Sequence, residues 1–144
     1  MNEVVRALRK MYNLERLAVE IYAGQIRAFS EEEIIDRLKA AMENEQEHVD
    51  DLRKRIGELD GTTSSLGFFF QMAGKVLAFT STLPGKKFVL KADIRLEKRA
   101  VKDYSAFLEK VNFDEESKAL IEKNIEDERL HIERWQDSLE MLKG

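Results

Sequence analysis

The sequence predicts an all-α fold in which four long helices form a bundle, with one extended crossover between the second and the third. The 144 residues include only seven Gly and one Pro, so few turns are available. Glu, Lys, Arg, Leu and Ala, which all have high helix propensity, are abundant. The chain length suits one domain, so residues 1–144 are expected to fold as a single unit.

The first two helices follow from apolar periodicity. Apolar residues recur at steps of three and four from about Glu3 to Phe29, which is typical of a helix with one buried face. Ser30 and Glu33 have the spacing of a capping box, so a second helix should begin there and continue to Gly57.

The second half of the chain predicts a crossover and two further helices. Residues 60–65 are turn-forming, and 66–83 are strongly apolar, which favours a short apolar helix. Pro-Gly at 84–85 ends this segment. Helices should span 86–111 and 114–142, and Asp114 should cap the second of them. A single long crossover between helices 2 and 3 is the ferritin-like arrangement of a four-helix bundle.

The chain contains an internal repeat. A shift of 82 positions aligns residues 14–22 with 96–104, and a shift of 83 aligns 44–48 with 127–131. Each half therefore offers one Glu on its first helix and a Glu-x-x-His on its second. Because the matched positions include both histidines of the chain, the repeat indicates two similar hairpins that share a function.

The repeated acidic and histidine positions predict a two-metal site. Residues at i and i+3 share a helix face, so each Glu-x-x-His can direct a carboxylate and an imidazole toward one point. Four ionised carboxylates inside a bundle would repel one another and be poorly solvated, and two divalent cations would remove that cost. This ligand type suits two Fe ions, with Mn as the alternative. The predicted metal ligands are Glu15, Glu45, His48, Glu97, Glu128 and His131.

Neighbouring residues are expected to support these ligands. Tyr22 and Tyr104 each follow a first-helix Glu by seven residues, so we expect them directly behind the metal ligands at the catalytic site. Asn44 and Asp127 directly precede the other two glutamates and are expected to orient a histidine of the opposite hairpin. Trp135 should pack in the core.

Composition restricts the function and the compartment. A formal net charge of −4 gives no basic excess, so we expect no nucleic-acid partner. The absence of Cys excludes disulfides, thiolate zinc sites, iron–sulfur clusters and a rubredoxin centre within the chain. The first ten residues lack the apolar region of a secretory signal, so a cytoplasmic location is expected, with a peripheral position on the inner face of a membrane as the alternative.

The apolar crossover, residues 66–83, leaves three interpretations open. It holds four of the eight Phe residues, yet Gln71, Lys75 and a Thr-Ser-Thr run make it too short and too polar to span a bilayer. It would either cross the bundle as a buried helix, form a homodimer interface, or contact a membrane or an apolar substrate as a peripheral element.

Several motifs resemble the demethoxyubiquinone hydroxylase family of the rubrerythrin-like superfamily. The stretch ERLAVEIYAGQ at 15–25 resembles the first ligand helix of that family, and FFQMAG at 69–74 with LPGK at 83–86 resembles its crossover. Glu97 with an Asp-Tyr pair at 103–104, and the Asp-Glu-x-x-His ending at His131, resemble its third and fourth helices. One position departs, because Asp103 stands where family members usually have a His.

The resemblance implies a ferritin-like bundle with a non-haem di-iron centre that activates O₂. It further implies a monooxygenase acting on a lipid-tailed quinone precursor or another small apolar substrate, supplied by an external electron donor. The six ligands carried over are the same six that the repeat predicts. Two alternatives stay open: a rubrerythrin-like peroxide scavenger or ferroxidase, and a non-enzymatic helical interaction module.

Overall fold

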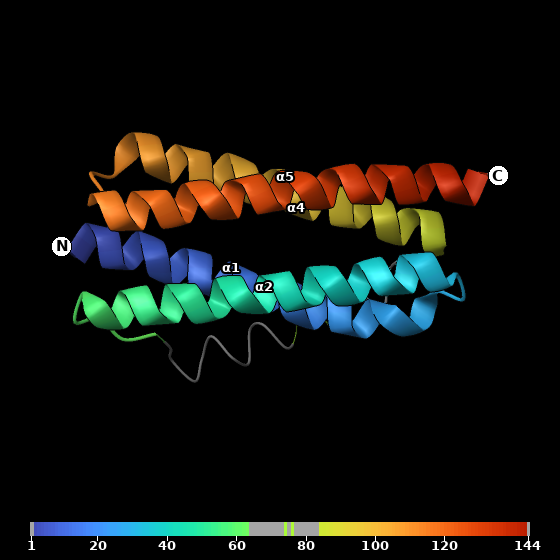
Figure 1. The fold of residues 1–144 in the computed structure, drawn as a ribbon, viewed down its shortest axis with the longest axis horizontal. Helices are drawn as coiled ribbons and strands as arrows, with labels where there is room; N and C mark the ends of the chain where they lie inside the picture. The colour runs from blue at the N-terminus through green and yellow to red at the C-terminus, as the bar shows by residue number, and fades with distance from the viewer. Residues whose placement is uncertain (1, 64–73, 75, 77–83, 144) are drawn as a thin grey trace.

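Four long helices make up most of the chain in the computed structural model, which describes residues 2–63, 74, 76 and 84–143 (Figure 1). They are α1 (Asn2–Gln25), α2 (Glu32–Glu58), α4 (Lys86–Lys110) and α5 (Glu115–Lys143), and a short 3-10 helix (Ile26–Ala28) follows α1. The predicted all-α four-helix bundle is confirmed. Of the helix expected over 66–83, only Gly74 and Val76 are described, and both are helical; the remainder lies outside the described residues.

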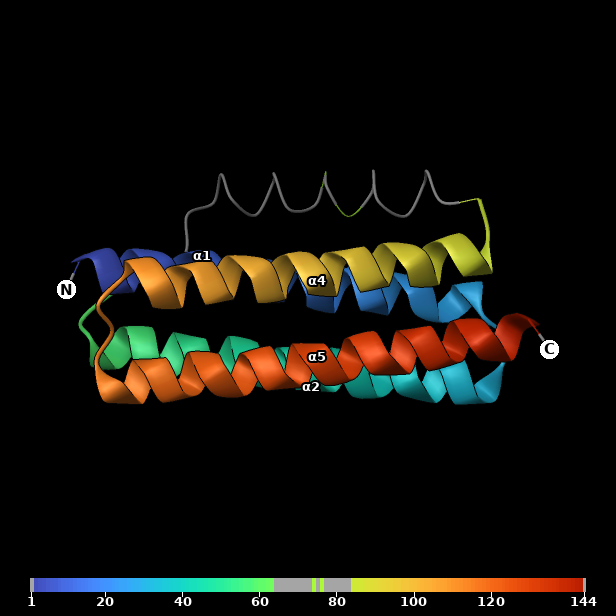
Figure 2. The ribbon, with the colours of Figure 1, turned by 90° about the horizontal axis from the view of Figure 1, so that it is seen from above.

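The helices pack as two layers. The closest packing is within each hairpin, α1 against α2 and α4 against α5. Seen from above, α1 and α4 form one layer and α2 and α5 the other (Figure 2). Each hairpin, α1–α2 or α4–α5, therefore contributes one helix to each layer. α2 and α4 run in the same direction, so the chain between them must return along the length of the bundle, as the ferritin-like arrangement requires (Figure 1).

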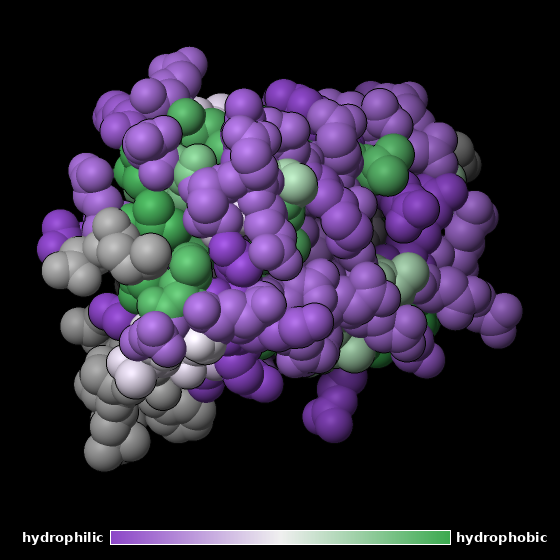
Figure 3. Space-filling model, turned by 60° about the vertical axis from the view of Figure 1, so that its left-hand side comes forward, coloured by the Kyte–Doolittle hydropathy of each residue, from purple (hydrophilic) through white to green (hydrophobic). Residues whose placement is uncertain are grey.

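Two hydrophobic clusters fill the interior on either side of a polar middle. One includes Leu8 and Leu52, and the other includes Leu38, Leu90 and Trp135, all fully buried. Figure 3 shows hydrophilic side chains over most of the visible surface, as the amphipathic pattern of the helices predicts. The described part of the chain contains no helix with the length and hydropathy of a membrane span.

The start of α2 differs from the expected capping box. The residue before the helix is Glu31 rather than Ser30, and no side chain caps the first turn. Lys86, at the start of α4, donates from Nζ to Ser30 Oγ at 3.2 Å and to the Glu31 carboxylate at 3.0 Å. The Ser30 hydroxyl is therefore bound to Lys86 and does not cap the helix. The local Ser-x-x-Glu pattern gives no information about this long-range contact.

The start of α5 is capped as the sequence predicts. Asp114 Oδ2 accepts a hydrogen bond from the backbone N–H of Ser117 at 3.0 Å. The same oxygen accepts from Arg55 Nη2 at 2.6 Å, which ties the end of α2 to the start of α5. Asp114 therefore holds the helix start and the junction between two helices.

Asp114→Ala is expected to lower the free energy of unfolding by about 1 kcal/mol, the typical cost of losing an N-cap. Urea unfolding followed by circular dichroism would measure the loss. Glu115→Ala is the matched control, because Glu115 is exposed one residue further along and caps nothing. An equal loss in both variants would contradict the capping role of Asp114.

Candidate metal centre

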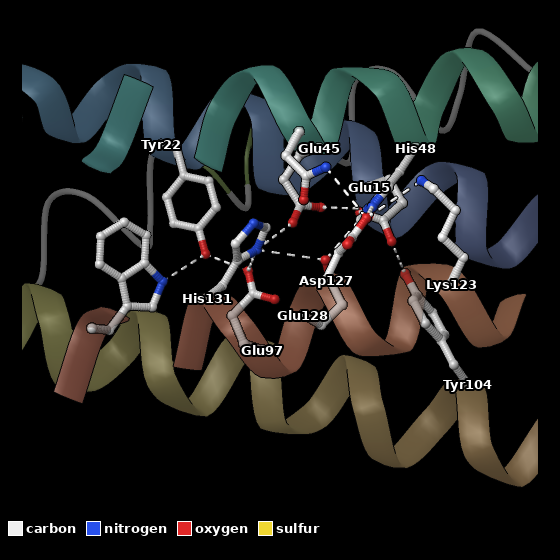
Figure 4. Close-up of polar contacts among 12 residues, drawn as sticks. Glu15, Tyr22, Glu45, His48, Glu97, Tyr104, Lys123, Asp127, Glu128 and His131 are labelled. Carbon is white, nitrogen blue, oxygen red and sulfur yellow. Dashed lines mark hydrogen bonds and ion pairs between the residues drawn. The ribbon is translucent and has the colours of Figure 1, made fainter. Parts of the chain in front are cut away.

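Six polar side chains meet in the middle of the bundle, between the two hydrophobic clusters (Figure 4). Each is at most 2% exposed. All four helices contribute, and the six residues are Glu15 from α1, Glu45 and His48 from α2, Glu97 from α4, and Glu128 and His131 from α5. The structure thus brings together every residue that the internal repeat singled out.

The six residues form two overlapping groups, each with the donor set of a metal site. Glu15, Glu45, His48 and Glu128 make one group, and Glu45, Glu97, Glu128 and His131 make the other. Within each group the four ligand atoms lie within 4.8 Å of one another. Because Glu45 and Glu128 belong to both groups, the arrangement suits two neighbouring cations that share two carboxylates.

Both histidines direct Nδ1 at the carboxylates. His48 Nδ1 lies 3.3 Å from Glu15 Oε2 and 3.4 Å from Glu128 Oε1. His131 Nδ1 lies 3.0 Å from Glu45 Oε1 and 3.6 Å from Glu97 Oε1. Each imidazole therefore presents the same nitrogen to the centre, so the two hairpins are alike in this respect.

Several polar atoms of this cluster have no hydrogen-bond partner among the described residues. These atoms are Oε1 and Oε2 of Glu45, Oε2 of Glu97, Oε1 of Glu128 and Nδ1 of His131. Although His131 Nδ1 lies 3.0 Å from Glu45 Oε1, the contact lacks hydrogen-bond geometry. A buried polar atom without a partner costs about 1–3 kcal/mol. Divalent cations would satisfy these atoms together, so the donor set fits a pair of metal ions.

The electrostatics of the cluster reflect the crowding of negative charge. Burial, together with the charges of the neighbouring carboxylates, raises the pKa of Glu45 and of Glu128 well above the usual value. Burial opposes ionisation of Glu15, but its interactions with the neighbouring Glu45 and His48 side chains lower its pKa. Burial also opposes the charged form of His48, yet its contacts with Glu15 and other acids raise its pKa to about 9. Without metal, the shared carboxylates therefore tend to hold protons.

Two tyrosines support the glutamates on α1 and α4. The Tyr104 hydroxyl donates to Glu15 Oε1 at 2.8 Å, and the Tyr22 hydroxyl donates to Glu97 Oε1. Each tyrosine thus reaches the glutamate of the other hairpin rather than its own. Since α1 and α4 are antiparallel, a position two turns beyond one glutamate is level with the other. Both tyrosine hydroxyls therefore lie directly behind the glutamates.

Trp135 extends the tyrosine contact into the core. Its indole Nε1–H donates to the Tyr22 hydroxyl oxygen at 3.2 Å, and the two ring centroids lie 5.5 Å apart. Trp135 is fully buried, as the sequence predicts. The indole therefore limits the positions that Tyr22 can adopt.

Asp127 orients one of the histidines. Its Oδ2 lies 2.8 Å from His48 Nε2, so the contact with the opposite hairpin is confirmed. Burial opposes ionisation of Asp127, but its contact with His48 lowers its pKa. Asn44, expected to do the same for His131, instead donates from Nδ2 to Asp127 Oδ2 at 3.3 Å. The repeat therefore breaks at this pair, because Asn44 and Asp127 lie close enough to bind each other.

A small cavity leads to the cluster between α1 and α4. Its volume is about 40 Å³, and it reaches Glu15, Glu97 and Glu128. Its apolar walls are Leu14, Ala18, Leu96 and Ala100. These residues occupy equivalent places in a Leu-Glu-x-x-Ala motif that occurs once in each hairpin. The internal repeat includes this motif, but from the sequence alone its Leu and Ala residues cannot be distinguished from ordinary core residues.

The mouth of the cavity carries an ion pair. Arg99 Nε lies 3.0 Å from Asp103 Oδ2, and both residues line the cavity. Arg99 and Leu14 are exposed, so the cavity opens to the outside. Asp103, where a His is usual in the family that the sequence resembles, therefore stands at the entrance with Arg99 as its partner.

A buried polar pair outside the cluster joins the C-terminal end of α1 to α4. The sequence analysis did not predict this pair. Gln25 Nε2 donates to Asp93 Oδ1 at 2.7 Å, and neither residue is more than 2% exposed. Gln25 Oε1 and Asp93 Oδ2 have no hydrogen-bond partner among the described residues. Burial raises the pKa of Asp93 well above its usual value, despite the hydrogen bond from Gln25.

Asp93→Asn is expected to stabilise the metal-free protein at pH 8. A carboxyl whose pKa is raised on folding favours the folded state at low pH, and that benefit disappears as the pH rises through the folded pKa. The Asn amide is neutral at both pH values and can also donate to Gln25 Oε1. We expect a gain of about 1–3 kcal/mol at pH 8 in urea unfolding and a much smaller one at pH 4.5.

Asp36→Asn on the exposed face of α2 is the matched control, with no change expected at either pH. If the unmodified protein and the Asp93→Asn variant were equally stable at pH 8, ionisation of Asp93 would not lower the free energy of unfolding, and the prediction would be wrong.

Solved structures support the fold of the chain. A DUF305 fragment from Deinococcus radiodurans has a TM-score of 0.79 at 16% identity, over 98% of this chain and 97% of that chain. The Mycobacterium tuberculosis bacterioferritin BfrA has a TM-score of 0.70 at 22% identity, over 99% of this chain and 87% of that chain. These likenesses confirm the ferritin-like bundle. No curated protein matches the chain.

Family membership rests on nearly the whole sequence. Residues 2–138 match the family described as "Ubiquinone biosynthesis protein COQ7". The match covers all four helices and all six residues of the cluster. The chain therefore belongs to the COQ7 family of ubiquinone biosynthesis proteins, which are di-iron hydroxylases of the ferritin-like superfamily.

Proposed function

We propose that this protein is a di-iron monooxygenase that uses O₂ to hydroxylate an apolar, quinone-like substrate. The observation that carries the proposal is the pair of overlapping carboxylate–histidine groups at the end of an apolar-walled cavity. In this proposal Glu45 and Glu128, which belong to both groups, would help to hold both ions. Glu15 with His48 completes one site, and Glu97 with His131 completes the other.

The reaction needs electrons that the chain cannot store. When bound, the two iron ions supply the redox chemistry that reduces O₂. Hydroxylation inserts one oxygen atom into a C–H bond and releases the other as water, which consumes two electrons and two protons. Two ferrous ions would hold the two electrons of one turnover. Because the sequence has no Cys for an iron–sulfur centre, an external donor would have to restore these electrons before the next turnover.

The residues around the ligands hold this site in shape. Tyr104 and Tyr22 fix the carboxylates of Glu15 and Glu97 through their hydroxyl groups. Asp127 fixes the ring of His48. The two hydrophobic clusters on either side exclude water, so the carboxylates would hold cations in surroundings of low polarity.

A second candidate function is a peroxide reductase of the rubrerythrin type. The specific observation in its favour is the cavity volume of about 40 Å³, which admits O₂, H₂O₂ or water but not a quinone ring. The hydroxylase proposal therefore requires the walls formed by Leu14 and Leu96 to separate when substrate binds. Both side chains belong to the entrance, where Leu14 is 37% exposed.

Single-turnover chemistry would test these functions. The purified protein would be loaded anaerobically with Fe(II), mixed with a short-tailed methoxy-quinol lacking one ring oxygen, and exposed to ¹⁸O₂. We expect about two Fe per chain and one ¹⁸O atom in the quinol product by mass spectrometry. Consumption of H₂O₂ without ¹⁸O in the quinol would favour the peroxide reductase. No Fe binding would overturn both and leave a non-enzymatic bundle.

A further inference from the structure

Tyr22 and Trp135 form a buried pair of oxidisable side chains beside the metal centre. The Tyr22 hydroxyl donates to Glu97 Oε1 (Figure 4), and the Trp135 indole Nε1–H donates to the Tyr22 oxygen at 3.2 Å. The two ring centroids lie 5.5 Å apart, with an angle of 48° between the ring planes. Phenol and indole are the aromatic side chains that lose one electron most easily. A hydrogen-bonded path of such groups therefore leads from Glu97 into the core.

Glu97 can hold Tyr22 and a cation at the same time. Its Oε1 accepts the hydrogen bond from Tyr22, whereas its buried Oε2 has no hydrogen-bond partner among the described residues. A cation bound at Oε2 would be separated from the Tyr22 hydroxyl by a single carboxylate. An electron and a proton can therefore leave Tyr22 toward the same group, which avoids a buried positive charge on the ring.

The other half of the chain has no equivalent pair. The single Trp of the chain binds Tyr22, so Tyr104, which donates to Glu15 at 2.8 Å, has no indole behind it. The shift of 83 that relates the second helices of the two hairpins aligns Leu52 with Trp135, and both side chains are fully buried. A tyrosine can therefore support a glutamate with only a leucine at this position, and the indole indicates a role beyond support.

The pair lies on the closed side of the metal centre. Among the described residues, those that line the cavity leading to the cluster include Tyr104 but neither Tyr22 nor Trp135. Both members of the pair are fully buried, and they belong to the hydrophobic cluster that includes Leu38 and Leu90. Molecules that enter by the cavity therefore reach Tyr104, whereas a radical on the pair would be shielded from water and from substrate.

We propose that Tyr22 and Trp135 act as an internal electron donor to the metal centre when O₂ reacts without substrate. Reduction of O₂ to two water molecules takes four electrons and four protons. Two ferrous ions hold two of these electrons, and a substrate C–H bond supplies the other two during hydroxylation. Without substrate, the pair supplies the third electron, and a further ferrous ion or the external donor supplies the fourth. This inference rests on the two-metal site of the proposed function, but not on hydroxylation of a quinol.

The transfer moves one electron and one proton from the indole toward the centre. Tyr22 first loses an electron to the centre and its hydroxyl proton to Glu97 Oε1. Trp135 then gives an electron to the tyrosyl radical, and its Nε1 proton moves along the 3.2 Å hydrogen bond to the Tyr22 oxygen. Tyr22 is again a neutral phenol, and a neutral radical is left on the buried indole. The other three protons come from solvent, and the external donor, with one more solvent proton, later restores the indole.

Radical spectroscopy would test this role. The protein would be loaded anaerobically with Fe(II), mixed with O₂ in the absence of quinol, frozen at successive times and examined by electron paramagnetic resonance. We expect an organic radical that appears first on Tyr22 and then on Trp135. The indole signal can be assigned directly because the chain has a single Trp, and ring-deuterated Tyr would alter only the tyrosyl signal. Trp135→Phe should abolish the indole signal and leave the tyrosyl signal.

Tyr104→Phe is the matched control, because it removes the hydroxyl that supports the other glutamate. The radical yield per bound iron should be unchanged in this variant and lost in Tyr22→Phe. An indole radical that persists in Tyr22→Phe, a radical lost in Tyr104→Phe, an unchanged signal in Trp135→Phe, or no radical in the unmodified protein would each overturn the proposal.

The hydroxylase proposal is measured separately, by ¹⁸O in the quinol product of the same iron-loaded protein. A radical in the absence of quinol, together with no ¹⁸O in added quinol, would support the internal donor and contradict the hydroxylase. Labelled quinol with no radical in the absence of quinol would do the reverse. In either case one electron from the pair does not replace the external donor, which hydroxylation and recovery of the indole both require.

Discussion

Glu128→Gln is expected to abolish binding at both metal sites, because Glu128 belongs to both overlapping groups. Loss of a residue that only supports a ligand typically costs 10–100-fold in metal affinity, so loss of a shared ligand should cost at least about 100-fold at each site. His48→Ala, by contrast, removes a ligand of one group only. The metal-to-protein ratio after anaerobic Fe(II) addition and gel filtration would show near zero for the first variant and about one for the second.

In the absence of metal, Glu128→Gln should not lower the stability of the protein. Burial and neighbouring charges raise the pKa of Glu128, so a neutral Gln avoids a buried charge at pH 8. Metal-free Glu128→Gln protein should therefore be at least as stable as the unmodified metal-free protein, and should gain almost nothing from added metal. Glu133→Gln, exposed on the same helix, is the matched control. A variant that still binds two ions would refute the shared role of Glu128.

The stability of the metal-free protein should fall as the pH rises, whereas the stabilisation that metal adds should grow. Burial opposes the charged form of His48, but its acidic contacts raise its pKa to about 9. Its contribution to stability is therefore complete below about pH 6.5 and lost as the pH approaches 9. The raised pKa values of Glu45 and Glu128 act in the same direction. Between pH 5 and 9 the metal-free protein should lose about 3 kcal/mol, or roughly 10 °C in Tm.

Metal binding requires deprotonated ligands, so the stabilisation from metal should grow as the pH rises. Mn(II) under anaerobic conditions is a suitable probe because it avoids iron oxidation. Thermal unfolding with and without Mn(II) at pH 5, 7 and 9 would reveal two curves that diverge with pH. Parallel curves would mean that the metal does not bind at the titrating cluster. The lowered pKa values of Glu15 and Asp127 affect stability only below this range.

Much of this architecture could be predicted because it depends on short-range periodicity. The helix positions follow from apolar spacing, and the six residues of the cluster follow from a repeat that includes both histidines. Contacts between hairpins were harder to foresee. The loss of the Ser30 cap depends on Lys86, which lies 56 residues away. The pairing of Tyr22 with Glu97 depends on the antiparallel packing of α1 and α4.

The buried Gln25–Asp93 pair and the apolar cavity walls were not predicted, for related reasons. A single Gln and a single Asp, 68 residues apart, give no periodic signal that they will meet in the core. The alanines of the cavity matter because small side chains leave space, and space is a property of three-dimensional packing rather than of sequence order. Asn44 shows the limit of the repeat, since equivalent positions need not make equivalent contacts.

The division of ligands between the hairpins has a consequence for chains of half this length. Each overlapping group takes three of its residues from one hairpin and the fourth from the other. One isolated hairpin would therefore leave both coordination spheres incomplete, however well it folded. Two copies of a single symmetric hairpin, associated about a dyad, would supply a full set, so a minimal version of this centre could be assembled from a peptide of about 60 residues as a homodimer.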